Sequence, residues 1–171
     1  MPERQDMVPL EVAVRQIESA REYTLTLLED LHDDQWFVQP VPDQSHIAWQ
    51  VGHITMAQYA LTLLRIRGKE PDDQGFITNS FFKFFKKGST PQPREAGPSA
   101  DEIRLTFRAV YDRAMVEMPD YSPDVLGESL PAPYFATPTK LGSLLFASHH
   151  ELLHAGQIGL LRRLLGKAPV R

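Results

Sequence analysis

The sequence predicts an all-α protein that folds as a four-helix bundle, with one domain over residues 1–171. Four segments carry apolar residues at helical spacing, and no segment shows the alternation of apolar and polar residues that marks a strand. Long proline-containing connections follow the second and the third of these segments, as in bundles with crossover connections. A chain of this length can bury a core without covalent cross-links, and the sequence contains no cysteine.

The composition limits the classes of function. With 18 Lys and Arg against 22 Asp and Glu, the formal net charge is −4, which argues against nucleic acid or an anionic membrane as the main partner. The lack of cysteine excludes disulfides, thiolate ligands and a cysteine nucleophile, and fits a reducing compartment. No apolar signal core and no run of about 18 apolar residues is present. We therefore expect a soluble, cytoplasmic protein with a small-molecule substrate and no nucleic-acid or membrane partner.

The first predicted helix covers residues 9–31. Pro9 suits a first helical turn, and the inward positions recur every three or four residues, at Leu10, Ala13, Ile17, Ala20, Thr24, Leu27 and Leu31. The second predicted helix covers residues 45–67, with Ser45 as its N-cap and Gly68 directly after its end.

The second helix is apolar on two sides. One stripe contains two histidines and the other is aliphatic; they comprise His46, Trp49, His53, Met56, Ala60 and Leu63, and Ile47, Val51, Ile54 and Leu61. A helix of this kind is buried twice, by the bundle and by either a connection or a second subunit. Gly52, directly before His53, indicates that another segment approaches closely there.

The connection over residues 69–98 differs from the rest of the chain. It holds five phenylalanines within ten positions, namely Phe76, Phe81, Phe82, Phe84 and Phe85. Because a connection of this length exceeds what the fold needs, we expect it to form a lid whose phenylalanines wall a pocket above the histidines. A short amphipathic helix that only covers the end of the bundle is the alternative.

The third and fourth helices have recognisable start signals. Ser99 and Glu102 form a capping box that opens a helix over residues 99–118, and proline follows it. Thr137 and Pro138 are predicted as N-cap and first residue of a helix over 138–165, which ends before a glycine.

A cluster of chemically active residues lies in the fourth helix. His150 and His154 are four residues apart, so they project from one face and can bind one divalent cation. With Glu151 between them the string reads H-E-x-x-H. A metalloprotease would need a further ligand downstream, but residues 155–171 contain no His, Asp, Glu or Cys. If a metal binds here, its third ligand must therefore come from earlier in the chain.

Four other histidines are available as third ligand or neighbour: His32, His46, His53 and His149. His53 lies in the middle of the second helix, at a depth where packing can bring it opposite the other pair. A single histidine on an apolar face is more often a hydrogen-bonded core residue. Three imidazoles that converge in a bundle would instead form an open site of the kind used for catalytic zinc.

These residues also resemble a known family. Gly-His53-Ile after Ile-Ala-Trp, together with His150-x-x-x-His154-x-Gly-Gln157-Ile, resembles the DinB/YfiT-like superfamily of metalloenzymes. The resemblance implies an up-down-down-up bundle, a divalent metal (zinc or nickel) held by His53, His150 and His154, and frequent dimerisation. Some relatives are S-transferases that use mycothiol or bacillithiol.

The sequence thus supports three functional hypotheses. The first is a metal-dependent enzyme, a hydrolase or a thiol S-transferase, that activates a water or an external low-molecular-weight thiol. The second is a non-catalytic metal-dependent binding or stress protein, and the third is a structural bundle with buried histidines. In an enzyme, Glu151 is a candidate general base, although it can equally point away from the metal. Gln157 is a candidate to bond a ligand, or else it satisfies the backbone of the second helix.

We also expect a homodimer through the second and fourth helices. The aliphatic stripe of the second helix and a stripe of the fourth (Leu145, Ser148, Leu152, Ala155 and Gly159) exceed what one bundle is expected to bury. A two-fold axis is the commonest symmetry for soluble oligomers.

Overall fold

The computed structural model describes residues 9–131 and 138–170. In these ranges the chain forms helices and turns, and its only β pairing is one isolated bridge between Ser129 and Thr139. The prediction of an all-helical protein is confirmed. Among the described helices, none is both long and apolar enough to cross a lipid bilayer.

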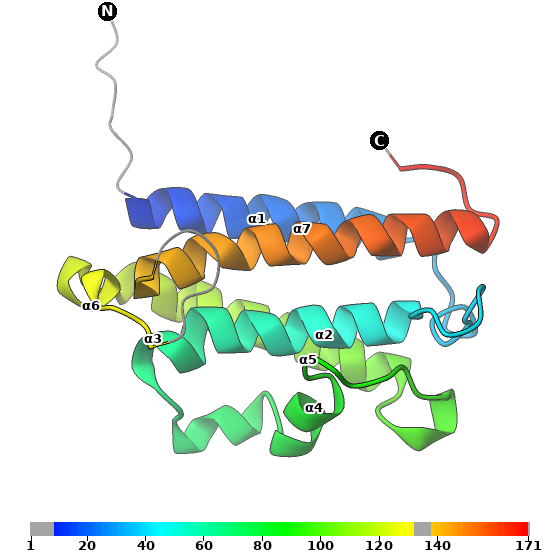
Figure 1. Cartoon of the computed structure of the whole chain (residues 1–171), viewed down its shortest axis with the longest axis horizontal. Coiled ribbons are helices and arrows are strands. Elements are labelled where there is room, and N and C mark those ends of the chain that lie inside the picture. Colours follow the sequence, from blue (N-terminus) through cyan, green and yellow to red (C-terminus); the bar gives the residue numbers. More distant parts are fainter. Residues whose placement is uncertain (1–8, 132–137, 171) are drawn as a thin grey trace, which may run out of the picture.

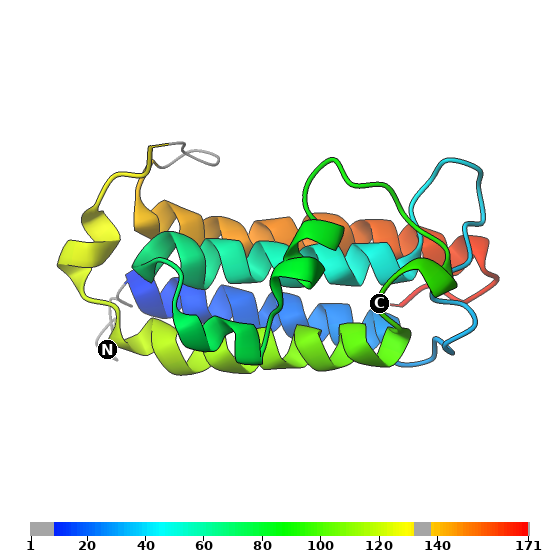
Figure 2. The same ribbon diagram turned by 90° about the horizontal axis from the view of Figure 1, so that it is seen from below.

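Long helices account for most of the described chain. They are α1 (Pro9–Leu28), α2 (Ile47–Tyr59), which continues through the π-helical turn η1 (Ala60–Leu64) into α3 (Arg65–Arg67), α5 (Ala100–Glu117) and α7 (Lys140–Leu164). The connections add the short elements η2 (Pro71–Gly75), α4 (Asn79–Phe84), η3 (Arg94–Ala96), η4 (Met118–Asp120) and α6 (Pro123–Gly127). Figures 1 and 2 show the long helices side by side, with α4 beneath α2.

The capping box of α5 forms as predicted. The Ser99 hydroxyl accepts from the Glu102 N–H at 3.2 Å, and the Glu102 carboxylate accepts from the Ser99 N–H at 2.8 Å. Reciprocal bonds of this kind satisfy donors that the first helical turn leaves without partners.

The predicted N-caps of the second and fourth helices are wrong by one and two residues. The cap of α2 is His46, not Ser45: its Nδ1 accepts from the Trp49 N–H at 3.0 Å, and its ring is buried. The cap of α7 is Thr139, whose hydroxyl accepts from the Gly142 N–H. Thr137 lies outside the described residues. An imidazole nitrogen can replace the usual hydroxyl because the cap needs only an acceptor at the correct distance.

Cross-helix hydrogen bonds define how the long helices run. The helices α1 and α7 run in the same direction. Arg21 of α1 contacts Glu151 of α7, and further along both helices the Leu27 carbonyl accepts from Arg162. The α2–α3 stretch and α7 run in opposite directions. Gln50 contacts His154, whereas the later residue Leu61 accepts through its carbonyl from the earlier residue Ser143. The α2–α3 stretch and α5 run in the same direction. Arg21 bridges Gln58 and Phe107, and further along both segments Arg67 pairs with Glu117.

The central helix of the fold is α2, which contacts α5, α7 and the α4 region. Every residue from Ile47 to Tyr59 is buried except Trp49, which is partly buried. Both stripes of this helix are therefore covered within one chain.

The α7 stripe is only partly covered, since Leu145 and Gly159 are partly buried. Ser148 and Ala155 are buried, and a Cβ on Gly159 would lie 3.9 Å from Leu27 of α1, whereas Leu152 is exposed. The surplus apolar surface on which the dimer prediction depended is thus absent from α2 and only partly present on α7. The oligomeric state itself stays a prediction.

The connection over residues 69–98 runs along α2 and packs its phenylalanines inward. Phe81 and Phe85 are buried, and Phe85 lies directly over Gly52, where a Cβ would meet the ring at 2.4 Å. Phe76 and Phe82 meet Tyr59 of α2 edge-on, with ring centroids 6.1 and 6.0 Å away. The expected close approach at Gly52 is confirmed, and the partner is this connection.

Candidate metal centre

Three histidines from two helices converge between α2 and α7. His53, His150 and His154 each offer one ring nitrogen, and these atoms all lie within 4.8 Å of one another. The ring centroids of His53 are 5.2 Å from His150 and 4.7 Å from His154, and the latter two are 4.5 Å apart. The i, i+4 spacing aligns the pair on α7, and the opposite course of α2 brings His53 to the same level.

The spacing of the nitrogens suits one ion after a small adjustment. A tetrahedral ion with bonds of about 2.0–2.1 Å holds its ligand atoms about 3.3 Å apart. If the imidazoles rotate so that their nitrogens move inward by roughly an ångström, the nitrogens reach that separation. The donor set, three imidazoles, suits zinc and other borderline transition metals better than calcium or magnesium.

Hydrogen bonds fix the orientation of two of the rings. His53 Nδ1 lies 2.7 Å from the carbonyl oxygen of Phe85, and His154 Nδ1 lies 2.6 Å from the side-chain oxygen of Gln50. Because both partners are oxygen acceptors, each Nδ1 carries the proton and each Nε2 keeps a free lone pair. Metal-binding histidines in proteins are oriented by partners of this kind.

Gln157 contributes through Gln50. The Gln50 amide nitrogen donates to the Gln157 side-chain oxygen at 2.7 Å, while the Gln50 oxygen accepts from His154. In this arrangement the Gln50 amide presents its oxygen to His154 and its nitrogen to Gln157. Gln157 therefore orients Gln50, the hydrogen-bond partner of His154. Its bond goes to this side chain and not to the backbone of α2, which it was also considered to satisfy.

Burial keeps the histidines neutral. Burial as the larger cause, and the neighbouring histidines as the smaller one, together lower the pKa of His150 to about 4 and that of His154 to about 3. Burial also lowers the pKa of His53, against the opposing effect of its bond to the Phe85 carbonyl. Neutral imidazoles are the form that binds metals, so the cluster is ready for an ion at neutral pH.

A pocket of about 420 Å³ opens onto the cluster. Trp49 stacks on His53 with centroids 4.8 Å apart and an angle of 7° between the planes. The pocket continues along α2 and α7, past Met56, Ala60, Leu61 and Phe146. The expected phenylalanine wall from residues 69–98 is wrong: that connection contributes Lys87 and Gly88, because its phenylalanine rings pack against α2 and one another.

Glu151 lies apart from the histidine cluster in a buried ion pair. Arg21 donates to its two carboxylate oxygens at 2.8 and 3.3 Å, and only 4% of each side chain is exposed. The same guanidinium donates to Gln58 and to the Phe107 carbonyl, and it stacks on the Phe107 ring at 3.5 Å. Glu151 thus joins α7 to α1, α2 and α5, and it does not line the pocket.

The remaining histidines are not in the cluster. His46 caps α2, and its Nε2 donates to the Gln92 carbonyl at 2.9 Å. His149 is exposed and donates to the Leu145 carbonyl of its own helix. His32 is exposed after α1.

Sequence reasoning did not find Gln50 or the Phe85 carbonyl. Gln50 lies three residues before His53, on the same side of α2, and a polar residue at that spacing from a candidate ligand is a usable signal. The role of the Phe85 carbonyl has no such signal, because any residue supplies a carbonyl.

Comparison with known proteins agrees with this arrangement. A search of curated proteins gave no match. The family model of the DinB superfamily matches residues 16–158, a range that includes α2, α5 and all three histidines of the cluster. The chain therefore belongs to the DinB superfamily.

Proposed function

We propose that the histidine cluster is a divalent-metal centre and that the protein is a metal-dependent enzyme, a hydrolase or a thiol S-transferase. The observation that carries the proposal is the orientation of the rings: Nδ1 of His53 and of His154 is occupied by an acceptor, so Nε2 is left for an ion. Zinc and nickel are the expected ions. A bound cation of this kind lowers the pKa of a water or a thiol that reaches its open position.

The residues of the chain have separate roles in this proposal. Gln50 and the Phe85 carbonyl orient the ligands, and Trp49 limits the movement of the His53 ring. The apolar walls of the pocket exclude bulk water, which strengthens electrostatic interactions with a substrate. Since the sequence has no cysteine, a reacting thiol would be a small molecule from outside.

We assign the up-down-down-up topology to the bundle as part of the same proposal. The cross-helix contacts support it, since α1 runs with α7, α2 runs against α7, and α5 runs with α2. In this order His53 and the α7 pair meet near the middle of the two helices, where surrounding packing holds them rigidly.

Metal binding tests the first half of the proposal. We expect the chelator-treated protein to bind one equivalent of Zn²⁺ or Ni²⁺ in isothermal titration calorimetry. His53→Ala, His150→Ala and His154→Ala should each abolish tight binding, whereas the exposed control His149→Ala should bind as the unmodified protein does. Equal binding by the cluster variants would disprove the metal centre.

A reaction screen tests the second half. The metal-loaded protein is incubated with activated esters, amides and electrophiles, with and without low-molecular-weight thiols, and His150→Ala is the control. Turnover that requires the cluster identifies an enzyme, and a requirement for thiol separates a transferase from a hydrolase. Tight metal binding with no turnover in either arm would instead favour the metal-dependent binding protein.

A further inference from the structure

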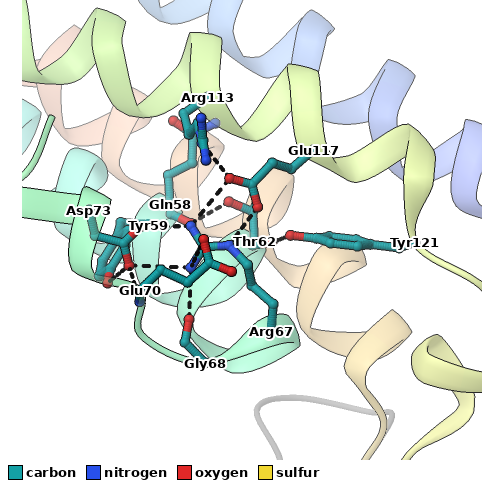
Figure 3. A network of polar contacts seen from close by, with 10 residues as sticks. All are labelled: Gln58, Tyr59, Thr62, Arg67, Gly68, Glu70, Asp73, Arg113, Glu117 and Tyr121. Carbon is teal, nitrogen blue, oxygen red and sulfur yellow. Dashed lines mark hydrogen bonds and ion pairs between the residues drawn. The ribbon is translucent and has the colours of Figure 1, made fainter. Parts of the chain in front are cut away.

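The helix that carries His53 changes form before it ends. After Tyr59 the chain makes the π-helical turn Ala60–Leu64 and then returns to α-helix as α3. Side chains from other elements bond carbonyls of this turn: the Leu61 carbonyl accepts from the Ser143 hydroxyl at 2.9 Å, and the Thr62 carbonyl accepts from the Tyr121 hydroxyl at 3.0 Å. Figure 3 shows the second of these bonds. A wide turn held from two sides is a built feature, and such turns are frequent at functional sites.

The π-helical turn decides which way Arg65 faces. In an uninterrupted α-helix each residue turns about 100°, so Arg65, twelve residues after His53, would lie about 120° away from the histidine side. A π-helical turn accommodates one extra residue, which sets all later residues back by about 100°. Arg65 then lies within about 20° of the direction of His53. Consistent with this, Arg65 and His53 line the same pocket.

A neighbouring ion-pair network fixes this rotation. Arg67 donates to Asp73 at 2.7 Å and pairs with Glu117 of α5, and Tyr59 also donates to Asp73 at 2.7 Å. Figure 3 shows Arg67 between these two carboxylates. Residues two apart on a helix point in roughly opposite directions. With Arg67 held toward α5 and η2, Arg65 is therefore directed toward the pocket between α2 and α7.

Among the residues that the structure describes, the charged ones lining the pocket are all cationic. Its described lining includes two cationic residues, Arg65 and Lys87, and no Asp or Glu. Apolar residues, among them Met56, Leu61 and Phe146, line the same pocket, and Met56 and Leu61 come between His53 and Arg65 along the helix. Lys87 lies at the histidine end of the pocket, because residues on either side of it in the chain contact that end. The Phe85 carbonyl bonds His53, and the Ser89 hydroxyl bonds the Trp49 indole. An anion enters such a site more readily than a cation.

We propose that Arg65 recognises a carboxylate or phosphate group at one end of an apolar substrate whose other end reaches the histidines. This rests on the proposed function only in taking the histidine end as the reacting end. Arg65 supplies a planar, permanently charged fork that suits either anion. The apolar walls suit an aliphatic or aromatic stem, and Lys87 adds positive potential at the histidine end.

Binding of simple amphiphiles to the metal-free protein tests the proposal. The probes are octanoate, octyl phosphate and the uncharged 1-octanol. Binding is followed by calorimetry and by tryptophan fluorescence, because Trp49, one of the two tryptophans, lines the pocket. We expect both anions to bind at least about tenfold more tightly than 1-octanol. Arg65→Gln should remove this preference, Arg65→Lys should keep part of it, and Arg15→Gln, an exposed arginine of α1, should change nothing.

A double variant tests the π-helical turn. Ser143→Ala combined with Tyr121→Phe removes both hydroxyls that bond its carbonyls. We expect this protein, with helical content checked by circular dichroism, to lose much of the preference for octanoate while it still binds 1-octanol. If the folded double variant still prefers octanoate over 1-octanol to the same extent, the π-helical turn does not direct Arg65.

The outcomes separate this inference from the proposed function. Equal affinity for octanoate and 1-octanol, or a preference that survives Arg65→Gln, overturns the inference even if the protein binds metal. Octanoate binding that requires the metal but not Arg65 places the carboxylate at the histidines and also overturns it. Arg65-dependent binding in a protein that fails to bind any metal would support the inference and overturn the metal centre.

Discussion

At the scale of single residues, the informative atoms are the Nδ1 atoms of His53 and His154. Each faces an oxygen acceptor, and this decides the tautomer of the ring without any ion. A buried histidine that only satisfied the core would commonly use both nitrogens for hydrogen bonds within the protein. Two adjacent imidazoles with a second nitrogen kept for the pocket side indicate a site arranged to bind something.

The pair Gln50 and Gln157 gives the first prediction. Gln50→Ala should weaken metal binding about 10–100-fold, because removal of a residue that orients a ligand has an effect of that size. Gln157→Ala should weaken it less. In the Gln50→Ala background Gln157→Ala should have no further effect, because Gln157 acts through the Gln50 amide.

Titration of Zn²⁺ into the four proteins of this double-mutant cycle measures the coupling, with Gln16→Ala on the exposed side of α1 as control. Additive effects would mean that Gln157 contacts the metal site by another route.

The pH dependence of stability gives the second prediction. Burial lowers the pKa of His150 to about 4 and of His154 to about 3, below the ordinary value of 6.5 for an unfolded chain. Between these values the unfolded chain binds more protons than the folded protein. The free energy of unfolding of the metal-free protein should therefore fall as pH falls from about 6.5, by up to roughly 1.4 kcal/mol per pH unit for each histidine.

Urea unfolding at several pH values from 7.5 to 5.0 measures this slope, and a variant with both residues changed to Gln is the reference for all other titrating groups. The reference should show a clearly shallower slope. Parallel slopes would mean that the two histidines are protonated in the folded protein as readily as in the unfolded chain.

At the scale of elements, the contact between α2 and the 69–98 connection links packing to the site. Phe85 places its ring over Gly52 and its carbonyl on His53, the next residue of α2. Further bonds from Ser89 to Trp49 and from the Gln92 carbonyl to His46 hold the same connection to the start of α2. The connection is thus a support for the site rather than a phenylalanine-walled lid.

Gly52 provides the third prediction. Gly52→Ala places a Cβ 2.4 Å from the Phe85 ring, so the connection must move away from α2. We expect a loss of about 1–3 kcal/mol of stability, together with weaker metal binding because the Phe85 carbonyl moves with the ring.

Gly156→Ala in α7 is the matched control, since no atom lies within 4 Å of the added Cβ. It should raise stability by up to about 1 kcal/mol, because alanine favours a helix more than glycine does. Thermal unfolding and Zn²⁺ titration of both variants measure the effects. If Gly52→Ala binds Zn²⁺ as tightly as the unmodified protein does, the Phe85 contact does not contribute to metal binding.

At the scale of the whole molecule, one buried ion pair connects the long helices. Arg21 of α1 contacts Glu151 of α7, Gln58 of α2 and the Phe107 carbonyl of α5. Both carboxylate oxygens of Glu151 accept from Arg21. Its role as a general base stays a prediction, which would require the carboxylate to leave this pair and reach a substrate.

The fourth prediction follows from this pair. Glu151→Gln leaves the buried Arg21 charge without compensation and should cost roughly 3–5 kcal/mol of stability. Asp112→Asn, which breaks an exposed pair with Arg108, should change stability by no more than about 0.5 kcal/mol.

Urea unfolding gives both values. Metal titration of the folded fraction of Glu151→Gln should show little change in affinity, because Glu151 lies outside the histidine cluster. A large loss of affinity without loss of stability would place Glu151 in the site.

The oligomeric state belongs to the same scale. The chain itself covers the α2 stripe of the predicted interface and only part of the α7 stripe, of which Leu152 is exposed. Leu153, Leu160 and Leu164 of α7 are also exposed, on a helix whose opposite side packs on the bundle. Sedimentation equilibrium at tens of micromolar protein measures the mass and decides whether a dimer forms.

The sequence alone determined the helical class, the approximate span of each long helix and the pairing of His150 with His154. These properties depend on local periodicity, on the capping box of α5 and on the i, i+4 geometry of a helix, all of which are encoded within a few residues of one another. The selection of His53 also came from local information, its place on an apolar stripe of a central helix, together with the family resemblance.

Only the tertiary structure decided the partners across elements. Glu151 meets Arg21 and not the histidines, Gln157 meets Gln50, and the phenylalanines of 69–98 pack on α2 instead of walling the pocket. Likewise, nothing local in the sequence marks the π-helical turn that directs Arg65, since Ala60–Leu64 reads as ordinary apolar helix. Such features depend on how the packed helices are rotated and shifted relative to one another, and that is set by the fit of all their surfaces at once.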